Sequence, residues 1–377
     1  MTVRVEKFGD LFEFLPKSGL KASDRQLNGA FPFFTSSSEQ SKWTDAPVYS
    51  DEARVFATGG AAAVHHVTGT FATSADCYVA SPSRTCPIVA RYAYRYLTYN
   101  INAIEAGFRG AGLRHVSKGF LQGLSIPIPP PSKQLRIVEI VDKADALRAK
   151  RRAALAQLDT LTQSILLDMF GDPATNPKGW PDTQTLGEMA DIVSGVTKGR
   201  NLDGKKTREV SYLAVVNVQD RALDLSVVKM IEATEEEIGR YRILPNDLLL
   251  TEGGDPDKLG RGTLWSGEIA ECIHQNHIFR VRLTTTAIHP LFLNWLVGSQ
   301  RGKRYFLRSA KQTTGIASIN MTQLRAFPLL LPPLELQRDF AQRIASVERL
   351  KMAQQASLTD LDALFTSLQH RAFRGDL

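Results

Sequence analysis

Residues 199–206 combine types that could bind phosphate. They read Gly-Arg-Asn-Leu-Asp-Gly-Lys-Lys, which is close to a phosphate-binding loop. A lysine stands at position 206, where such a loop needs a hydroxyl group for magnesium, and residues 210–218 are typical of a strand rather than a helix. Because no helix N-terminus follows to hold a phosphate, we do not expect nucleotide hydrolysis here. The basic residues of this segment suit a DNA backbone or a solvated loop equally well.

Two further segments have the residue types of a cofactor site or a metal site. Residues 108–112 (Phe-Arg-Gly-Ala-Gly) are similar to the loop that binds S-adenosylmethionine, but they follow a helical pattern instead of a buried strand. We therefore interpret them as a turn. Cys272, His274 and His277 are closely spaced but have no evident fourth ligand, and their stretch alternates like a strand. We expect no metal site there.

Acidic residues do not form a convincing catalytic set either. Asp255, Asp257 and Lys258 lie in a glycine-rich stretch without the strand that normally carries the carboxylates of a metal-dependent nuclease. The pattern favours a chain with no catalytic residue, no cofactor site and no metal site of its own.

Two glycine pairs and one basic stretch suit contact with a large partner. The segments 58–60 (Thr-Gly-Gly) and 251–254 (Thr-Glu-Gly-Gly) each follow a strand-like run, and glycine permits close approach of a partner to the backbone. Residues 301–311 contain five basic and no acidic side chains. On a helix these would form a stripe suited to phosphates, and a merely solubilising face is the alternative.

The elements that must position these residues occur twice in the chain. Residues 129–134 (Pro-Pro-Pro-Ser-Lys-Gln) return as 332–337 (Pro-Pro-Leu-Glu-Leu-Gln), and leucines after each copy recur at an offset of 203 residues. A repeat of this length indicates two copies of one unit, each a globular segment followed by a helix. Two similar readers separated by rigid helices would suit a target with two ends, such as duplex DNA.

Each predicted helix carries one apolar seam. Its members in residues 137–170 are Ile137, Val141, Ala144, Leu147, Leu155, Leu158, Leu161, Ile165 and Met169. In the last helix they are Ile344, Val347, Leu350, Leu358, Leu361, Phe365 and Leu368. This heptad-like spacing favours packing of the two helices as a coiled coil, and the alternative is that each helix covers its own domain.

Before the helices, short apolar runs predict strands. They are residues 31–34, 53–57 and 77–80 in the first half and 210–218 and 247–251 in the second. Patterns at 88–106 and 291–307 predict one helix each.

Composition allows nucleic-acid binding without demanding it. The 377 residues carry a net charge of +7 with a pI near 9.3. Three scattered cysteines argue against a disulfide framework. No apolar run is long enough to cross a bilayer and no export leader opens the sequence, so we expect a cytoplasmic protein.

In this order, these motifs resemble the specificity subunit of Type I restriction–modification systems. The resemblance covers essentially the whole chain. It rests on the following segments: 33–36, 43–45, 58–60, 69–71 and 110–118, then 180–181, 186–188, 212–213, 246–251 and 319–320, the two Pro-Pro-x-x-x-Gln copies, and the helix ends 170–172 and 373–377.

The resemblance implies an α+β fold with two globular target-recognition domains in a pseudo-two-fold arrangement. Two long helices forming an antiparallel coiled coil would join them. The implied boundaries are 1–128 and 173–331 for the recognition domains, with spacer helices at 129–172 and 332–377. The sequence begins almost directly with the first domain, so an extra N-terminal helix is not expected.

The resemblance also implies the chemistry of the complex. Each domain would read one half of a bipartite duplex DNA target. Partners would be modification (methyltransferase) subunits, two in number, and restriction (motor-nuclease) subunits. S-adenosylmethionine, ATP and Mg²⁺ would be bound by those partners. The rival interpretations are a scaffold without DNA preference and a stand-alone methyltransferase or nuclease.

Candidate DNA-contacting residues follow from the motifs and from the preference of Arg and Lys for guanine and of Asn and Gln for adenine. In the first half they are Thr35, Ser36, Thr58, Gly59, Gly60, Arg109, Arg114, His115 and Lys118. In the second they are Lys198, Arg200, Lys205, Lys206, Gly253, Gly254, Gln275, Asn276, Arg304, Lys311 and Gln312.

Overall fold

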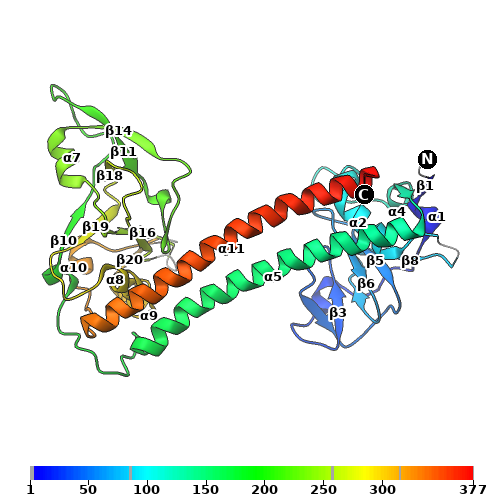
Figure 1. Ribbon diagram of the computed structural model, residues 1–377, viewed down its shortest axis with the longest axis horizontal. Helices are drawn as coiled ribbons and strands as arrows, with labels where there is room; N and C mark the ends of the chain where they lie inside the picture. Colours follow the sequence, from blue (N-terminus) through cyan, green and yellow to red (C-terminus); the bar gives the residue numbers. More distant parts are fainter. Residues whose placement is uncertain (1–3, 85–86, 256–258, 314–315, 377) are drawn as a thin grey trace. The chain divides into compact units, whose positions relative to one another are not determined.

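The structure is a computed structural model that describes residues 4–84, 87–255, 259–313 and 316–376. The chain forms two compact units. The first comprises Met1–Ala153 and Gln354–Leu377, and the second comprises Ala154–Ala353. Each unit contains one globular part and portions of both long helices, α5 (Pro131–Phe170) and α11 (Leu334–Arg374) (Figure 1).

The first globular part contains two main sheets. A four-stranded antiparallel sheet has the order β2-β8-β5-β6, formed by Phe12–Phe14, Cys77–Pro82, Ala53–Ala57 and Val64–Val67. A three-stranded sheet has the order β4-β3-β7, formed by Lys42–Thr44, Phe31–Phe34 and Ala72–Thr73. Strand β1 (Arg4–Lys7) pairs with β9 (Ser125–Ile128) just before α5 begins.

The second globular part repeats this topology. Its four-stranded sheet has the order β10-β19-β15-β17, formed by Ala190–Ser194, Ile278–Leu283, Leu248–Thr251 and Gly262–Leu264. Its three-stranded sheet has the order β14-β11-β18, formed by Lys229–Ala233, Arg208–Leu213 and Cys272–His274. Strand β11 has one antiparallel and one parallel neighbour, as β3 does in the first part.

Smaller pairings complete the second part. Strand β12 (Val218–Gln219) pairs with β13 (Ala222–Leu223), and β16 (Gly253–Gly254), β21 (Ile316–Ser318) and β20 (Lys311–Thr313) form a short sheet. The first three strands predicted from sequence are confirmed. Residues 210–218 are not one strand, because β11 ends at Leu213 and a 3₁₀ turn over Val215–Asn217 separates it from β12.

Short helices accompany the sheets of each part. In the first they are α1 (Phe8–Leu11), α2 (Ala90–Tyr99), α3 (Ile101–Glu105) and α4 (Lys118–Gln122). In the second they are α6 (Leu186–Met189), α7 (Glu235–Tyr241), α8 (Pro290–Val297), α9 (Gln300–Ser309) and α10 (Met321–Arg325). The single helix predicted at 291–307 is therefore wrong: Gly298 ends α8, and the Ser299 side chain caps α9 by accepting from Arg301 N.

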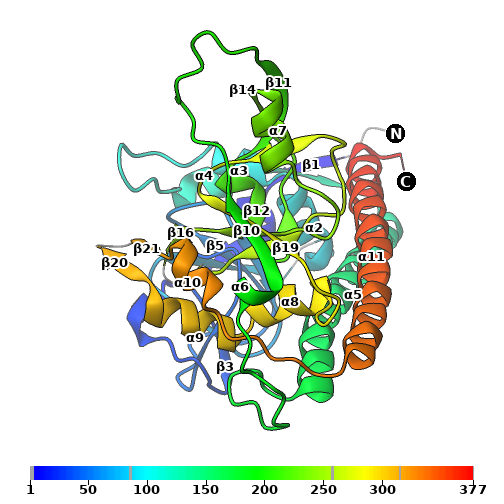
Figure 2. The same cartoon turned by 90° about the vertical axis from the view of Figure 1, so that its left-hand side faces the viewer.

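Within each unit the two long helices pack antiparallel (Figures 1 and 2). In the first unit, Lys133 Nζ donates to Gly375 O (2.8 Å) and Arg148 Nε donates to Asp362 Oδ1 (2.5 Å). In the second unit, Lys351 Nζ lies 2.9 Å from Asp159 Oδ1. As the residue number rises on α5, the partner's number falls on α11. The expected fold class is confirmed, with two mixed α/β parts and two long helices.

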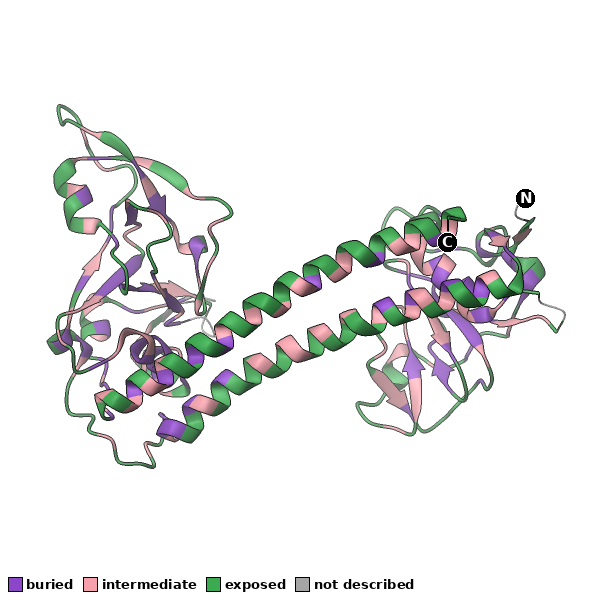
Figure 3. Ribbon diagram, in the orientation of Figure 1, coloured by how far each residue is buried: buried purple, intermediate pink, exposed green. Residues whose placement is uncertain are grey.

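The buried faces of α5 and α11 follow a heptad pattern, but three of the predicted seam residues are not part of it (Figure 3). The buried and half-buried positions on α5 include 134, 137, 141, 144, 148, 151, 155, 158, 162, 165 and 169, and the positions 203 residues later on α11 are likewise buried or half-buried. Leu147, Leu161 and Leu350, which we predicted in the seam, are exposed instead. The seam positions next to these leucines are occupied by polar residues, Arg148, Thr162 and Lys351. A search for apolar residues therefore selected the neighbouring leucine in each case.

The repeated glutamine of the Pro-Pro-x-x-x-Gln motif fastens each long helix to its globular part. Gln134 is fully buried; its Oε1 accepts from Val89 N (2.7 Å) and its Nε2 donates to Pro129 O (2.8 Å). Gln337 makes the equivalent bonds with His289 N (2.8 Å) and Pro332 O (2.7 Å). Val89 and His289 are the N-cap residues of α2 and α8. Each glutamine therefore accepts a hydrogen bond from a backbone N–H at the start of a helix that packs against the long helix.

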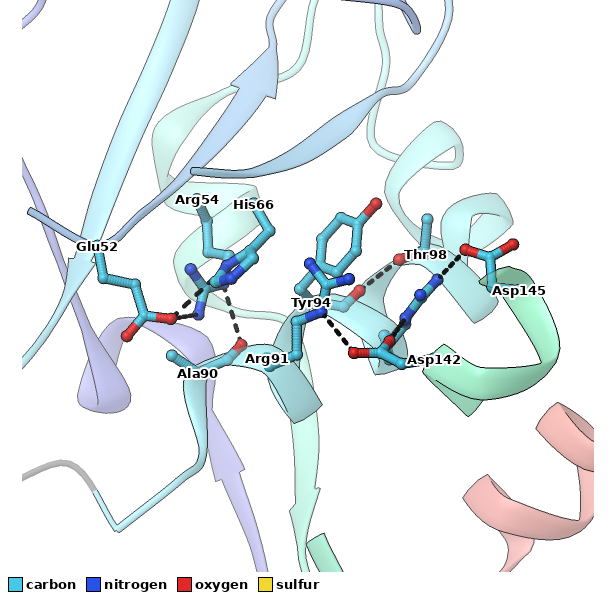
Figure 4. Close-up of polar contacts among 10 residues, drawn as sticks. Glu52, Arg54, His66, Ala90, Arg91, Tyr94, Thr98, Asp142 and Asp145 are labelled. Carbon is cyan, nitrogen blue, oxygen red and sulfur yellow. Dashed lines mark hydrogen bonds and ion pairs between the residues drawn. The ribbon is translucent and has the colours of Figure 1, made fainter. Parts of the chain in front are cut away.

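A network of charged groups reinforces this attachment in the first unit. On α2, Arg91 and Arg95 bind Asp142 of α5 (3.1 and 2.6 Å), and Arg95 also binds Asp145 (2.9 Å). Arg54 of β5 is fully buried and donates to the carbonyl of Ala90, as Figure 4 shows.

The second part uses aromatic packing at the equivalent place. Trp295 of α8 lies under the Arg221 guanidinium (4.0 Å to the ring centroid) and packs edge to face on Phe340 of α11. The two parts therefore share a fold but attach to their helices by different interactions.

We predict that Gln134→Ala destabilises the protein by about 1–3 kcal/mol, because it leaves the partly buried Val89 N–H without its Gln134 acceptor. Urea unfolding monitored by circular dichroism measures the change. Gln157→Ala, at an exposed position of the same helix, is the matched control and should change stability by less than about 0.5 kcal/mol. Equal effects of the two substitutions would refute the anchoring role.

Candidate nucleic-acid interface

The glycine pair of the first part joins the loop that contains most of its candidate residues. Val116 N donates to Thr58 O (3.1 Å), Gly59 forms a β-bridge with His115, and His115 Nδ1 lies 3.1 Å from Thr58 O. A Cβ at Gly59 would stand 3.1 Å from the imidazole, so glycine leaves room for the ring. Gly60 has a φ of +80°, which favours glycine for a second reason.

Two hydroxyl candidates meet at one carbonyl near this junction. Ser36 Oγ and Thr58 Oγ1 each donate to Asp76 O (2.8 Å). Thr35 is the half-buried neighbour of Ser36, at the end of β3. Thr35, Ser36 and the glycine pair, separate in the sequence, are therefore brought to one region.

The basic candidates of the first part are exposed, and two of them make local contacts. Arg109 donates to Ala106 O (2.6 Å), and Arg114 forms an ion pair with Glu105 (2.8 Å). Lys118 begins α4, and its ammonium lies 5.5 Å from the Phe14 ring centroid. Both arginine side chains lie on the surface, where such ion pairs exchange readily with water and other anions.

The second part contains the same junction, in which Ser318 and Ile319 stand 203 residues after His115 and Val116. Ile319 N donates to Glu252 O (2.9 Å), and Gly253 and Gly254 pair with Ser318 and Ala317. A Cβ at Gly253 would lie 2.9 Å from Ala317 O, so the strand pairing requires glycine. The correspondence of the two glycine loops, inferred from sequence, is confirmed by these hydrogen bonds.

A concavity of about 530 Å³ opens beside this second junction. Its lining includes Glu252, Gly253, Gly254, His277 and Ser318. His277 Nδ1 lies 2.6 Å from Glu252 Oε2, so the imidazole orients the carboxylate. A carboxylate can accept from a base amino group, which makes Glu252 a candidate that the sequence-based selection omitted.

A neighbouring concavity of about 270 Å³ brings together two predicted residues and one that we did not predict. Lys198 and Gln275 line it, as does Lys229 of β14. Gln275 Oε1 accepts from Val215 N (3.2 Å), which directs the side chain, and the adjacent Asn276 Nδ2 lies 3.4 Å from His277 Nε2. Lys229 had no sequence signal, because it lies 31 residues from Lys198 and meets it only through the sheet.

Arg200 differs from the other candidates because a carboxylate holds it. Its Nε and Nη2 bind Glu237 (2.5 and 2.7 Å), and this contact lowers the pKa of Glu237 to about 2. Lys205 and Lys206 are exposed in the loop that precedes β11, so no helix follows the phosphate-loop-like segment. We expected a strand over residues 210–218. The absence of an α-helix there is as expected, but the strand ends at Leu213.

The basic stretch at 301–311 forms α9 and the start of β20. Arg304 and Arg308, four residues apart, line a concavity of about 420 Å³ with Tyr305 and Ser309. Arg301 is paired with Asp182 (3.2 Å). Lys311 is exposed on β20, and the Gln312 backbone pairs with Ala317, although its side chain is outside the described atoms.

The cysteine and histidine candidates for a metal site differ in burial. Cys272 and His274 are fully buried on β18, where burial raises the pKa of the thiol to about 12 and lowers that of the imidazole to about 4. His277 is exposed. Across the described residues, no three His, Cys, Asp or Glu side chains are grouped as metal ligands. Cys86, Asp257 and Lys258 lie outside those residues.

Comparison with known proteins shows which proteins the chain resembles. Residues 2–157 match the model of the Type I restriction modification DNA specificity domain. The resemblance inferred from the motifs is confirmed. The specificity subunit of the Type I enzyme StySPI from Salmonella potsdam is 24% identical over 294 residues, and that of EcoKI from Escherichia coli K12 is 23% identical over 291. Each alignment covers 73% of this chain and 62% of the relative, so the chain spans less than two thirds of their length.

The fold agrees with solved relatives. A Type I S subunit from M. genitalium superposes with a TM-score of 0.63 at 15% identity, covering 99% of this chain and 96% of that one. A chain from a structural study of the assembly of a Type I system gives a TM-score of 0.56 at 18% identity, covering 99% and 98%. Among the described residues, no helix is long and apolar enough to span a membrane.

We predict that Arg304→Ala weakens binding to all DNA sequences alike and reduces the slope of log affinity against log salt by about 1, because one phosphate contact is lost. Fluorescence anisotropy at several salt concentrations measures this. Arg208→Ala is the control, since Glu235 and Glu271 already neutralise that guanidinium at 2.5 Å each. A changed sequence preference with unchanged affinity would assign Arg304 to base reading instead.

Proposed function

We propose that this chain is the non-catalytic DNA specificity subunit of a Type I restriction–modification complex. The observation that carries the proposal is the repeated topology: two globular parts with the same strand orders each contain the same glycine junction. Two similar but unequal surfaces suit a bipartite DNA target in which each half has its own sequence. The match of residues 2–157 to a specificity domain supports the same assignment.

Differences between the two junctions support different half-site sequences. His115 of the first part corresponds to Ser318 of the second, and Thr58 corresponds to Glu252. A hydroxyl can donate to or accept from base edges, whereas a carboxylate only accepts and favours the cytosine amino group. The two parts would therefore select different bases at corresponding positions.

The partners and cofactors follow from this role. Modification subunits would bind S-adenosylmethionine and methylate adenine, and motor-nuclease subunits would use ATP and Mg²⁺. The chain itself would supply recognition, in the cytoplasm where the DNA lies. The finding that Cys272 and His274 are buried apart from His277 gives no support to the rival enzyme interpretation. The scaffold interpretation leaves the paired glycine junctions without a role.

The first prediction of this role concerns genomic methylation. In a host that expresses the chain with its modification subunit, single-molecule sequencing should reveal a bipartite methyladenine motif. Deleting the gene for this chain should abolish the motif, because the modification subunit would then lack its target reader. Methylation that persists unchanged after the deletion would favour a scaffold.

The second prediction concerns two exposed leucines on each long helix. Leu147 and Leu161 of α5 correspond to Leu350 and Leu364 of α11, and all four are between 44% and 53% exposed. The first unit contains Leu147 and Leu364, and the second contains the equivalent residues Leu350 and Leu161. Two equivalent pairs of exposed leucines suit two copies of one partner. We expect Leu147→Glu with Leu350→Glu to release modification subunits, as measured by co-purification and mass photometry. Lys150→Glu, also exposed, is the control; equal retention in both would refute the contact.

A further inference from the structure

The concavity of about 270 Å³ in the second part presents hydrogen-bond donors to a partner. Its lining includes Lys198, Lys229 and Gln275. Tyr212 and Ile231 add apolar surface beside them. None of the described residues that line it is acidic. Because an ammonium group donates hydrogen bonds and never accepts them, the two lysines suit a partner that offers acceptors.

Three segments that are distant in the sequence bring these side chains to one place. Lys229 of β14 pairs with Tyr212 of β11, and β18 lies on the other side of β11 (Figure 1). Gln275 follows β18 directly and forms a parallel β-bridge with Val196. Lys198 stands two residues after Val196, so this bridge brings it to the same concavity as Gln275. All of these residues belong to the second unit.

Hydrogen bonds fix the amide of Gln275. Its Oε1 accepts from Val215 N (3.2 Å), and only the oxygen of an amide can accept from a backbone N–H. The backbone of Gln275 is held as well, because its N–H donates to Leu213 O (2.9 Å). Among the described residues, none accepts from Nε2, which leaves this donor for a partner. Bidentate recognition of adenine needs the amide oxygen as well as the nitrogen, so the general preference of glutamine for adenine does not apply to Gln275.

The concavity adjoins the glycine junction of the second part. Val215, whose N–H holds Gln275, lines the larger concavity together with Glu252. The carbonyl of His277, two residues after Gln275, accepts from Glu252 N (2.9 Å). The donor of Gln275 and the carboxylate of Glu252 are therefore held by one connected backbone network. A surface that reads bases at the junction thus extends to Gln275.

Guanine is the base that matches this set of donors. Its major-groove edge offers two acceptors, N7 and O6, whereas thymine offers one, O4. Adenine and cytosine each place an amino group in the groove, which would face the donors and leave them unpaired. A phosphate also accepts hydrogen bonds, but the apolar surface of Tyr212 and Ile231 suits a flat base better than a hydrated anion.

We propose that Lys198, Lys229 and Gln275 read a guanine in the half-site bound by the second part, and that Gln275 Nε2 selects it. The two acceptors of guanine lie on one edge of the base, so the amide and one ammonium can each donate to one of them. The inference rests on the proposed function and names one base of the target.

The test is Gln275→Glu in the full chain, assembled with its modification subunits. Glutamate keeps an oxygen for the Val215 N–H and replaces the donor Nε2 by an acceptor. Methylome sequencing should show that one guanine of one half-site gives way to a base with an amino group, cytosine or adenine. Fluorescence anisotropy on DNAs that differ only at that base pair should show the preference for guanine reduced at least about tenfold.

Two further variants separate base reading from charge and from damage to the fold. Gln184→Glu adds the same charge at an exposed position of the same part and should keep the motif unchanged. Lys198→Met with Lys229→Met keeps Gln275 and its bond to Val215, and should weaken discrimination at the same base pair. This double variant carries the test if circular dichroism shows that Gln275→Glu does not fold, and an unchanged ratio of affinities for the two DNAs would then overturn the inference.

The outcomes distinguish the inference from the function on which it rests. A wild type without a bipartite motif would overturn the proposed function. A bipartite wild type, together with a folded Gln275→Glu variant that keeps the motif and binds all sequences more weakly, would overturn the guanine assignment alone and place a phosphate at the concavity. Adenine or thymine as the wild-type base at the altered position would also overturn it.

Discussion

The antiparallel packing of α5 on α11 is the constraint on which the rest of each unit depends. Each globular part buries its last strands and helices against the start of one long helix and the end of the other. In the first unit Ile137 and Phe365 join one core, and in the second Phe170 and Phe340 join another. A globular part without both helices would leave these apolar surfaces exposed to water.

The repeat conserves the contacts that hold each part to its helices and varies the rest. Gln134 and Gln337 make the same bonds, and Phe373 and Phe170 both pack into aromatic clusters, with Tyr92 and Phe292 respectively. Where the first part has the Arg95–Asp142 pair, the second has the Arg221 guanidinium over the Trp295 ring. The two globular parts are attached by the same glutamine-to-backbone hydrogen bonds but by different surrounding side chains. Their surfaces can therefore differ in sequence while each part stays at the equivalent position of the long helices.

The roles of several candidate residues depend on contacts with residues that are distant in the sequence. Gly59 leaves room for the imidazole of His115, 56 residues away, and Gly253 for the backbone of Ala317, 64 residues away. Lys229 meets Lys198 only through the sheet. Arg200, by contrast, has its charge satisfied by Glu237, so it differs from exposed Lys205 although both lie in one basic segment. Charge patterns in sequence therefore overestimate the free cations of a surface.

The sequence by itself determined the repeat, the family resemblance, the two long helices and a few of the short strands, because these depend on local periodicity and on spacing along the chain. It did not determine that Leu147 and Leu161 are exposed, because assigning a seam requires knowing that Arg148 and Arg151 find partners on α11. Nor did it show why the glutamine of each proline motif recurs. Only the tertiary structure decided these points, since a polar group can be buried where a distant segment supplies its hydrogen bond.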